Sequence, residues 1–485
     1  MFIGPMDNGA TLETDYLVIG AGAVAMAFVD ALIEDPDVDV IMVDRRPAPG
    51  GHWLDAYPFV KLHQPSANYG VNSTPLGHDR IDHGGPNRGF LELAGQPEIC
   101  EYFDRVMRHR FLSSGRVRFF PMTDYLGDRR LRSTLTAQES EVVVRRRVVD
   151  ATVLASRGPA TEPPPFEVAD DARCVPVGEL VGVAEPPTGI VIVGAGKTAM
   201  DACTWLLEQG TPPEAITWIR PRDGWLMNRA NFQPGAGAIA TFEGAVLELE
   251  AVAATGSVEE AYERLEQDEV MLRLDPSVQP TMGKGPTLTV AELQGLRRIE
   301  NVIRLGHVRR IERDQIVLDQ GAIPTTPGHL HVHCAAPGLP RVLPRPIFTG
   351  DTITLQCITR QNPTLSAAVT GFVETTDRST AEKNRLLPPN PYSDTPFDFL
   401  RSVLMGLGTE AGWGDAPDLQ AWLDDSRLNV VKGVESTEDG TRLQDLQVRF
   451  LTALFPALDK IREFGAAATP SEQELMFDPE RNAAA

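Results

Sequence analysis

The chain has 485 residues, which is enough for two or three domains and a large buried core. Its 45 basic and 67 acidic residues give a formal net charge of −22 at pH 7, which disfavours binding to nucleic acid or to an anionic membrane surface. No cationic leader with an apolar core precedes Thr14, and no uninterrupted apolar run is long enough to span a bilayer. The five cysteines are odd in number and form no C-x-x-C pair, so we expect a cytoplasmic protein without a disulfide framework.

Residues 15–46 read as strand, glycine turn, helix and strand, and the rest of the chain is organised around this unit. Gly20 and Gly22 let the turn approach a pyrophosphate closely, and Ala25 is small enough for the helix to pack on the strand. Asp44 ends the second strand about where a carboxylate accepts a hydrogen bond from a ribose hydroxyl. The unit therefore predicts a site for FAD or NAD. The alternative is an ordinary strand–helix–strand turn that binds no nucleotide.

An irregular segment over residues 45–77 follows, rich in glycine, proline and aromatic residues. Such a segment inside a compact domain usually lines a site, although it could also be a structural connection that covers the sheet. Beyond it, the patterns predict a helix over 96–113, an extended ribbon over 131–155 and a proline-rich linker over 156–170.

The opening pattern returns later in the chain, with Gly194 and Gly196 between a strand and a helix. The next strand ends at Arg220, where the first unit has a carboxylate, and Arg222 and Arg229 follow. An arginine at this place suits a 2′-phosphate, so we expect the second unit to bind NADPH. The alternative is that these arginines are solvated surface charges.

Residues 240–298 are mostly helical by pattern, and short strands follow up to residue 318. The three histidines of HLHVHC (329–334) would share one face of a strand. Such a row could bind a metal, but it is more often a strand with polar residues on its wetter face, so we predict no metal site. After a proline-rich linker from residue 386, helices continue to the end, including an amphipathic helix over 441–464.

We therefore predict an α/β fold with two Rossmann-type three-layer dinucleotide-binding domains, one for FAD and one for NADPH, and a helical C-terminal extension. The predicted boundaries are 1–185 for the first part of the FAD-binding domain, 186–335 for the NADPH-binding domain with a helical insertion near 240–298, 336–385 for the second part of the FAD-binding domain, and 386–485 for the extension.

The two glycine turns, the GG-x-W segment at 50–53 and the late pair Gly350 and Asp351 follow one another in an order that resembles the two-dinucleotide flavoproteins. Within this group the chain is most similar to the class B flavin-dependent monooxygenases, which include flavin-containing monooxygenases, N-hydroxylases and Baeyer–Villiger enzymes. The resemblance covers roughly residues 14–375. It implies FAD and NADPH as cofactors, and O2 and a small molecule as substrates.

The resemblance also implies roles for the matching residues. The residues expected to hold FAD are Gly20, Gly22, Ala25, Asp44, Gly50, Gly51, Trp53, Gly350 and Asp351, with Asp351 on the ribityl chain. The residues expected to hold NADPH are Gly194, Gly196, Lys197, Arg220 and Arg222.

The irregular segment carries the expected catalytic residues. Lys61 and His63 fall where Baeyer–Villiger enzymes keep charged residues beside the flavin, and Asn72 with its following serine resembles a pair that flavin-containing monooxygenases use. His63, Gln64 or Asn72 would donate to the peroxide on the flavin, and His63 could also move a proton. The alternative for His63 is that it caps a turn or packs against Trp53.

By this resemblance the protein is an FAD-dependent NADPH oxidoreductase, and a monooxygenase that acts through a C4a-peroxyflavin on a nitrogen, sulfur or carbonyl. Two other functions stay open. One is an NAD(P)H:acceptor reductase without oxygenation, and the other is a flavin-binding redox or partner protein whose extension is an interaction surface. The absence of C-x-x-C argues against disulfide reductases of the same fold. The sequence does not identify the substrate, and a homodimer is possible.

Overall fold

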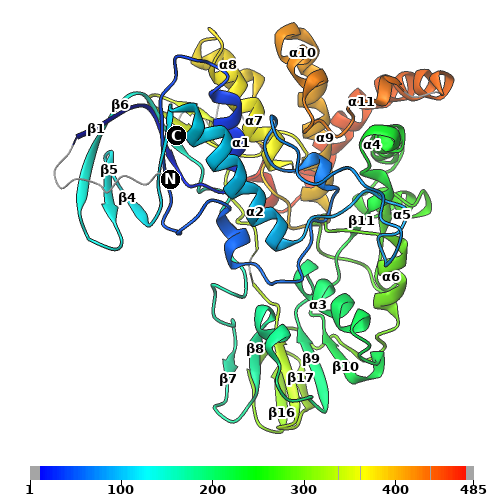
Figure 1. Ribbon diagram of the computed structural model, residues 1–485. Coiled ribbons are helices and arrows are strands. Elements are labelled where there is room, and N and C mark those ends of the chain that lie inside the picture. The colour runs from blue at the N-terminus through cyan, green and yellow to red at the C-terminus, as the bar shows by residue number, and fades with distance from the viewer. Residues whose placement is uncertain (1–10, 337, 361, 437–438, 477–485) are drawn as a thin grey trace.

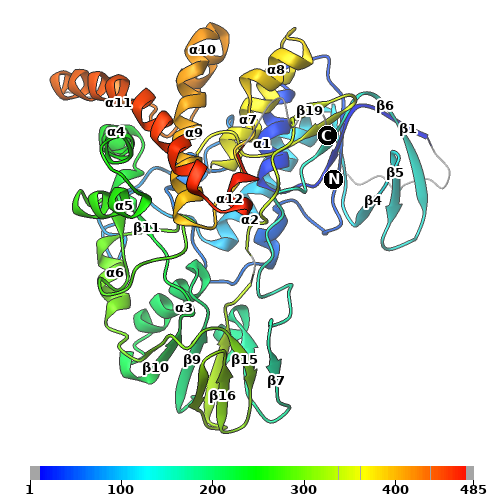
Figure 2. The same cartoon turned by 180° about the vertical axis from the view of Figure 1, so that it is seen from behind.

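The computed structural model describes residues 11–336, 338–360, 362–436 and 439–476. Two largely parallel sheets lie at the centres of two lobes, and helices from the last part of the chain lie at the upper lobe, beside α4, Ala238–Ala253 (Figure 1). The view from behind shows the same helices lying across the upper lobe (Figure 2).

The first sheet carries the first glycine turn. Its path is β19 (Phe348–Thr349), β20 (Thr352–Thr354), β6 (Glu139–Asp150), β1 (Thr11–Ile19), β2 (Val40–Val43) and β3 (Val117–Phe120), with β4 (Thr123–Gly127) and β5 (Arg130–Ser133) attached to β6. The strands β20, β6, β1, β2 and β3 run parallel to their neighbours. Strand β2 is apolar and buried along its whole length, as expected for an inner strand when both faces of a parallel sheet are covered.

Helices cover one face of this sheet: α1 (Ala23–Leu32), α2 (Gln96–Val106) and α7 (Pro363–Glu374). Helices α1 and α7 pack so closely that a Cβ at Gly371 would lie 2.5 Å from the carbonyl oxygen of Phe28. The ribbon of β4 and β5 covers the other face, where Leu131 is fully buried. The first lobe therefore has three layers.

The second lobe repeats this design. Its five-stranded parallel sheet has the order β14 (Val302–Ile303), β10 (Ile216–Ile219), β9 (Gly189–Val193), β18 (His329–His333) and β8 (Cys174–Pro176). One face is covered by α3 (Lys197–Glu208) and α6 (Val290–Arg297). The other face packs on a second sheet of β17 (Gly321–Pro324), β16 (Gln315–Leu318), β15 (Val308–Ile311) and β7 (Glu167–Val168). Two three-layer α/β units confirm the predicted fold class.

A further group of elements joins the region of residues 226–288 to the end of the chain. It consists of a small sheet of β12 (Met271–Leu272), β11 (Leu226–Asn228) and β13 (Thr287–Leu288), and of helices α4 (Ala238–Ala253), α5 (Val258–Gln267), α9 (Pro396–Gly412) and α11 (Gly440–Ala467). These helices share one apolar core, so the extension does not stand apart from the insertion. The extension also contains α10 (Pro417–Asp425) and α12 (Pro470–Gln473), and α8 (Thr380–Leu386) lies just before it.

The histidine row differs from the expectation of a wetter strand face. Strand β18 lies between β9 and β8 and both of its faces are covered, so His331 is 1% exposed and His333 2% exposed. His331 is satisfied by Thr325, whose hydroxyl lies 2.9 Å from its Nε2. Within the described ranges, no group of three or more His, Cys, Asp or Glu side chains could hold a metal ion.

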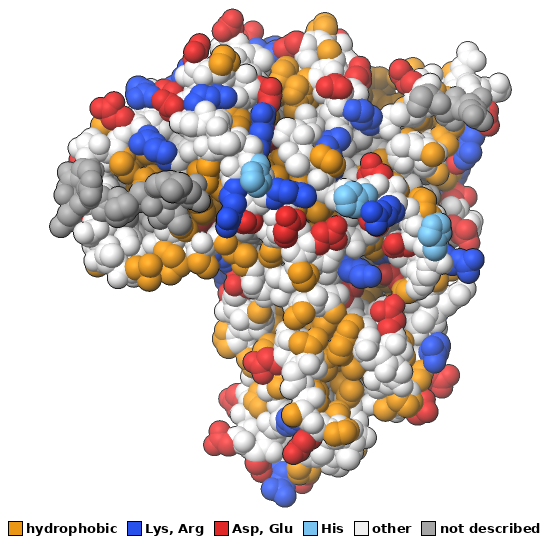
Figure 3. All heavy atoms as spheres, viewed as in Figure 1, with side chains coloured by type: hydrophobic (Ala, Val, Ile, Leu, Met, Phe, Trp, Pro, Cys, Tyr) orange, Lys and Arg blue, Asp and Glu red, His pale blue; other side chains and the backbone are white. Residues whose placement is uncertain are grey.

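None of the helices in the described part of the chain is both long and apolar enough to cross a membrane. Acidic and basic side chains are interspersed over the face seen in Figure 3.

Candidate nucleotide-binding site

The first glycine turn lies at the carboxyl edge of the first sheet, between β1 and α1. Gly20 has a φ of 105°, a value that glycine adopts without strain. Its amide donates to the carbonyl of Val43 at 2.8 Å, which ties the turn to β2. Helix α1 begins after Gly22, and no side chain caps its N-terminus. The first amide groups of α1 are therefore available to an anion such as a pyrophosphate.

Gly50 and Gly51 close directly onto this turn. Gly50 has a φ of 124° and Gly51 a φ of 59°, and the amide of Gly50 donates to the carbonyl of Ala21 at 2.8 Å. A Cβ at Gly51 would lie 2.9 Å from the Cα of Gly22, so no larger residue fits there without a shift of the backbone. The structure thus brings the two glycine pairs together, as the resemblance implied.

Trp53 stands behind this contact and is 7% exposed. Its Nε1 donates to the hydroxyl of Tyr69 at 2.6 Å. The pairing fixes the start of the irregular segment against a later part of the same segment. The aromatic rings in contact with Trp53 are those of His52 and Tyr69. Among the described residues, the ring of His63 makes no such contact with Trp53.

Asp44 is 7% exposed at the carboxyl end of β2. Its Oδ2 accepts from the amide of Ala21 at 2.7 Å and its Oδ1 from the amide of Arg46 at 2.8 Å. A carboxylate offers about four acceptor positions, so positions remain for ribose hydroxyls. Ala25 is 1% exposed where α1 lies on the sheet. The glycine turn, the uncapped helix and this carboxylate fit the adenosine diphosphate half of FAD.

The second glycine turn has the same construction at the carboxyl edge of the second sheet. Gly194 has a φ of 142°, and its amide donates to the carbonyl of Ile219 at 3.1 Å. A Cβ at Gly194 would lie 3.1 Å from the carbonyl carbon of Cys334, so the turn is closely packed. Gly196 precedes α3, whose N-terminus has no side-chain cap. A Cβ at Gly196 would meet no protein atom within 4 Å, so the space beside this residue is open.

Asp44 and Arg220 occupy the same position in the two units. Each follows the residue of its strand that pairs with the last residue of the central strand. Each backbone amide then donates to the next strand, Asp44 to the carbonyl of Phe120 at 3.2 Å and Arg220 to that of Ile303 at 2.9 Å. Arg220 therefore lies at the position in the second unit that Asp44 occupies in the first, as expected from the sequence.

The Arg220 side chain is 5% exposed and stacks on Trp218, with 4.7 Å between the guanidinium carbon and the ring centroid. Its Nε lies 3.4 Å from Oδ1 of Asp223, which also pairs with Arg304 at 3.1 Å. Burial lowers the pKa of Arg220, and the charge of Asp223 partly offsets this effect. Within the described residues, the buried Nε atoms of Arg220 and Arg304 make no hydrogen bond.

A cavity of about 360 Å³ opens beside these guanidinium groups. It is lined by Arg220, Leu274, Asp275, Pro276, Leu296, Arg297, Ile299, Glu300, Val302 and Arg304. This volume lies in the range of about 300–1,000 Å³ that small-ligand pockets occupy. The position of Arg220 and the adjoining space fit the 2′-phosphate side of NADPH.

Arg222 and Arg229 lie away from this cavity. Arg222 is 41% exposed and its Nη1 lies 3.7 Å from Oδ2 of Asp394. Arg229 is fully buried and pairs with Glu292 at 2.8 Å, while its Nε donates to the carbonyl of His63 at 2.9 Å. The alternative of solvated surface charges is wrong for Arg229, because its donors are used to hold the irregular segment on the second lobe.

The irregular segment of the first unit packs on the start of α3 in the second. Tyr57 donates from its hydroxyl to Oδ2 of Asp201 at 2.6 Å, and the other oxygen of Asp201 pairs with Lys197. Phe59 stacks on Trp205 with 4.8 Å between the ring centroids. Lys197 is therefore placed at the junction of the two units, beside the second glycine turn.

His63 lies at this junction, and Gln64 beside it is partly buried. Burial holds the pKa of His63 well below its ordinary value, and the charges of Lys197 and Arg229 act in the same direction. The imidazole is therefore neutral at pH 7, with one nitrogen as donor and the other as acceptor. Its ring can hold or pass one proton but carries no charge of its own.

Lys61 and Asn72 are not brought to the junction. Lys61 is exposed and its backbone forms an isolated bridge with Gly95. Asn72 faces the C-terminal extension, where its Oδ1 accepts from the hydroxyl of Ser426 at 2.8 Å and from the amide of Arg427 at 3.1 Å. The four expected catalytic residues therefore divide into one pair at the junction and two that lie elsewhere.

Gly350 and Asp351 do not lie at the nucleotide edge. They form the turn before β20, which runs parallel to β6, so Asp351 lies at the amino edge of the sheet, opposite Gly20. Its carboxylate is 60% exposed and pairs with Arg129 at 2.5 Å. The expectation that Asp351 holds the ribityl chain is wrong, because this Gly-Asp pair precedes a parallel strand and does not follow one.

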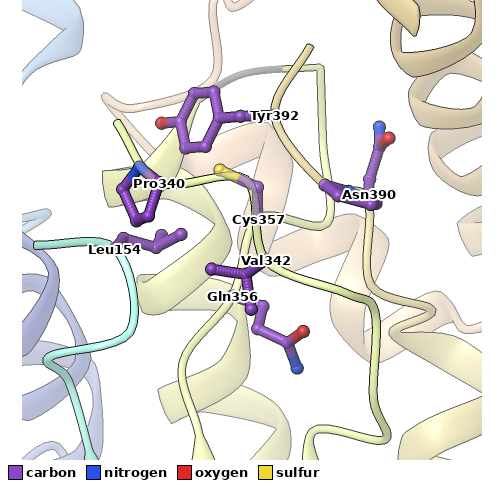
Figure 4. A pocket seen from close by; sticks show the side chains of 8 residues that line it. Leu154, Pro340, Val342, Gln356, Cys357, Asn390 and Tyr392 are labelled. Carbon is purple, nitrogen blue, oxygen red and sulfur yellow. The ribbon is translucent and has the colours of Figure 1, made fainter. Parts of the chain in front are cut away.

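The carboxyl end of β20 brings Gln356 and Cys357 to the nucleotide edge instead. They line a small cavity of about 10 Å³ together with Leu154, Pro340, Val342, Asn390, Pro391 and Tyr392 (Figure 4). Such a volume holds about one water molecule. Burial raises the pKa of Cys357 to about 12, so its thiol is protonated and unreactive at pH 7.

Sequence reasoning assigned no catalytic or binding role to Asn68 or Tyr57. Asn68 is 5% exposed, and its buried Oδ1 has no hydrogen-bond partner among the described residues. Both residues lie in the irregular segment, so the length of that segment was the available signal. No local pattern could have indicated Arg427, which lies hundreds of positions away from the residues it contacts.

The fold and the two glycine turns together define an α/β protein with two units of the strand, glycine turn, helix and strand type. No model of a known protein family matches the chain. It is 47% identical over 426 residues to the uncharacterized protein Rv2000 of Mycobacterium tuberculosis (strain ATCC 25618 / H37Rv), an alignment that covers 87% of this chain and 78% of the relative. The chain belongs to the same family as this mycobacterial protein.

Solved structures of similar fold are monooxygenases and a reductase. The polycyclic ketone monooxygenase of Thermothelomyces thermophila is 14% identical with a TM-score of 0.49, covering 93% of this chain and 90% of that one. An open structure of cyclohexanone monooxygenase is 14% identical with a TM-score of 0.48, covering 91% and 98%. The bacillithiol disulfide reductase Bdr of Staphylococcus aureus is 11% identical with a TM-score of 0.40, covering 68% and 78%. These likenesses concern the fold alone.

Proposed function

We propose that this protein is an FAD-dependent NADPH oxidoreductase and, within that class, a monooxygenase of small molecules. One observation carries the proposal. The two units have glycine turns of the same construction, and the strand that follows the helix is succeeded by Asp44 in one unit and by Arg220 in the other. A carboxylate at this position suits a ribose with a free 2′-hydroxyl, and an arginine suits a 2′-phosphate.

The residues of the chain would divide the binding between them. The amide groups that begin α1 would hold the pyrophosphate of FAD, and Asp44 would accept from its ribose. The amide groups that begin α3 would hold the pyrophosphate of NADPH, and Arg220 would meet its 2′-phosphate from the side of the adjoining cavity. Bound in this way, FAD would supply hydride acceptance from NADPH and electron transfer to oxygen or to another acceptor.

The junction supplies the remaining chemistry. The contacts of Tyr57 and Phe59 with α3 hold the two units together and exclude water between them. His63 is neutral at pH 7, so its ring can donate one proton and accept another without a charged intermediate on the residue.

The test is to purify the full chain, measure bound flavin, and follow anaerobic reduction by NADPH and then reaction with oxygen by stopped-flow spectroscopy. We expect one FAD per chain, reduction by NADPH in preference to NADH, and an oxygenated flavin species that lives longer than free reduced flavin would allow. Reduction followed by immediate peroxide release would favour the acceptor reductase. Very slow reduction by both nucleotides would favour the redox or partner protein, and a chain that binds no FAD would overturn the proposal.

A variant separates the oxygen step from the reduction step. His63→Ala should leave reduction of FAD by NADPH near its normal rate while peroxide leaks faster after reaction with oxygen. Loss of a donor to a developing charge costs about 2.7–4 kcal/mol where the donor is oriented in advance. If His63→Ala instead lowers FAD content and melting temperature together, the residue is structural.

A further inference from the structure

The C-terminal extension reaches back to the irregular segment through one arginine. Arg427 follows α10, and its guanidinium donates to four backbone carbonyls between residues 66 and 71. The distances are 3.0 Å to Tyr69 and 2.8 Å to Val71 from Nη1, and 3.4 Å to Ser66 and 2.5 Å to Ala67 from Nη2. Four carbonyls of an irregular turn thus have one common donor group.

The segment around Arg427 is itself held on both sides. On one side, Asn72 accepts from the amide of Arg427 at 3.1 Å. On the other side, the carbonyl of Leu428 accepts from Nδ2 of Asn362, the residue that caps the N-terminus of α7. Leu428 is fully buried in the core of the first lobe. Residues 426–428 therefore join the turn at 66–72 to the helix that packs on α1.

A continuous set of contacts leads from Arg427 to the first glycine turn. Arg427 holds the carbonyl of Tyr69, and the hydroxyl of Tyr69 accepts from Trp53. Trp53 lies in the short helical turn that begins at Gly51, and Gly51 touches Gly22. The turn at 66–72 also carries Asn68, whose buried Oδ1 has no hydrogen-bond partner among the described residues.

We infer that Arg427 is a positioning residue for the FAD site, so that the C-terminal extension completes the first nucleotide unit by holding the turn at 66–72 in place. The inference rests on the proposed binding of FAD. It assigns the extension a role inside the site, although none of the glycine motifs lies within it.

The test compares Arg427→Ala with the unaltered full-length protein by hydrogen–deuterium exchange and by FAD titration. Amide exchange should rise in peptides that cover residues 51–56 and 66–72, both with and without added FAD. Peptides that cover the second glycine turn, residues 194–200, should stay unchanged. FAD should bind about tenfold more weakly, the loss expected when a charge-assisted hydrogen bond to the turn is removed.

A matched control is Arg378→Ala. Arg378 forms two hydrogen bonds, at 2.7 and 2.6 Å, with Asp418 of α10, so it also ties the extension to the rest of the chain. Among the described residues, the side chain of Arg378 forms no hydrogen bond with the turn at 66–72. Its replacement should change neither exchange at 66–72 nor affinity for FAD.

A second pair of variants applies if Arg427→Ala is insoluble. Asn72→Asp keeps the oxygen that accepts from Ser426 and from Arg427, whereas Asn72→Ala removes it. Asn72→Ala should raise exchange at 66–72 and weaken FAD, and Asn72→Asp should restore both.

Equal FAD affinity in Arg427→Ala, or a rise in exchange spread evenly over the chain, would overturn the inference. If the unaltered protein binds no FAD, the proposed function fails, and the exchange at 51–56 and 66–72 still decides whether Arg427 orders the turn.

Discussion

The two nucleotide units are built on the same frame and differ in how each is closed. In the first unit Gly51 lies against Gly22, and the carboxylate of Asp44 accepts from the turn itself. In the second unit the space beside Gly196 is open, and Arg220 faces a cavity. This difference is consistent with the proposed roles, in which the first unit holds FAD and the second admits NADPH in each turnover.

The largest effect is expected from a side chain placed into the closed unit. Gly51→Val would put a Cβ 2.9 Å from the Cα of Gly22 at a residue whose φ is 59°. Strain and overpacking together should cost about 2–5 kcal/mol of folding free energy and abolish FAD binding. Thermal unfolding and the flavin content of the purified protein measure both effects.

Gly196→Val is the matched change in the open unit. Its Cβ meets no protein atom within 4 Å, so melting temperature and FAD content should stay near normal while NADPH binds more weakly. If Gly196→Val unfolds the protein as readily as Gly51→Val, the contrast between a closed and an open unit is wrong.

The next effect concerns the residue that distinguishes the nucleotides. Arg220→Ala should weaken NADPH and leave NADH nearly unchanged, because only NADPH offers a 2′-phosphate. A charge-assisted hydrogen bond contributes about 1.5–3 kcal/mol, which corresponds to about a 10- to 150-fold preference. Initial rates of flavin reduction over a range of both nucleotides give the ratio. Arg222→Ala, whose guanidinium pairs with Asp394, should move the ratio much less; an equal shift would place the phosphate elsewhere.

A smaller effect is expected where the units meet. Tyr57→Phe removes the hydroxyl that donates to Asp201 at 2.6 Å but keeps the ring contact with Phe59. The loss of one hydrogen bond to a charged group should cost about 1.5–3 kcal/mol, partly recovered through the remaining pair of Asp201 with Lys197. Urea unfolding measures the cost. Unchanged stability together with unchanged reduction by NADPH would show that the junction does not depend on this bond.

The smallest effect is the pH dependence that His63 adds to stability. Because its pKa in the folded protein is lowered, the unfolded chain binds more protons as the pH falls through the ordinary histidine value near 6.5. Stability should therefore fall between about pH 7 and pH 5, by at most about 1.4 kcal/mol per pH unit from this residue. His63→Gln should make the decline shallower. Parallel urea midpoints for the two proteins over this range would argue against a buried neutral ring.

The nucleotide turns could be predicted because their signals are local. Each unit has its signals within about 30 residues, as strand–helix–strand units require. These signals are a turn that needs glycine, the start of a helix and a charged residue at the end of the next strand. Arg220 matches Asp44 in strand register for the same reason. The His-x-His row was assigned to a strand correctly, but its burial depended on the neighbours β9 and β8, which no local pattern reveals.

The failed expectation at Asp351 shows the opposite case. The pair Gly350 and Asp351 has the residue types of a ribityl-binding motif, yet which edge of the sheet it occupies depends on the direction of β20 relative to β6. Strand direction follows from the whole path of the chain. Arg229 likewise has the positive charge that a phosphate-binding residue needs. Its guanidinium instead joins the carbonyl of His63 to Glu292 across the junction.

The sequence by itself determined the class of the two units and the charge that separates them, because period, glycine geometry and residue type act over a few neighbours. Only the tertiary structure decided which distant segments of the chain meet, because those contacts depend on the packing of the whole fold. Tyr57 against Asp201, Gly51 against Gly22 and Arg427 against the turn at 66–72 are of this second kind. In each of them, the partner is chosen by the fold and not by spacing along the chain.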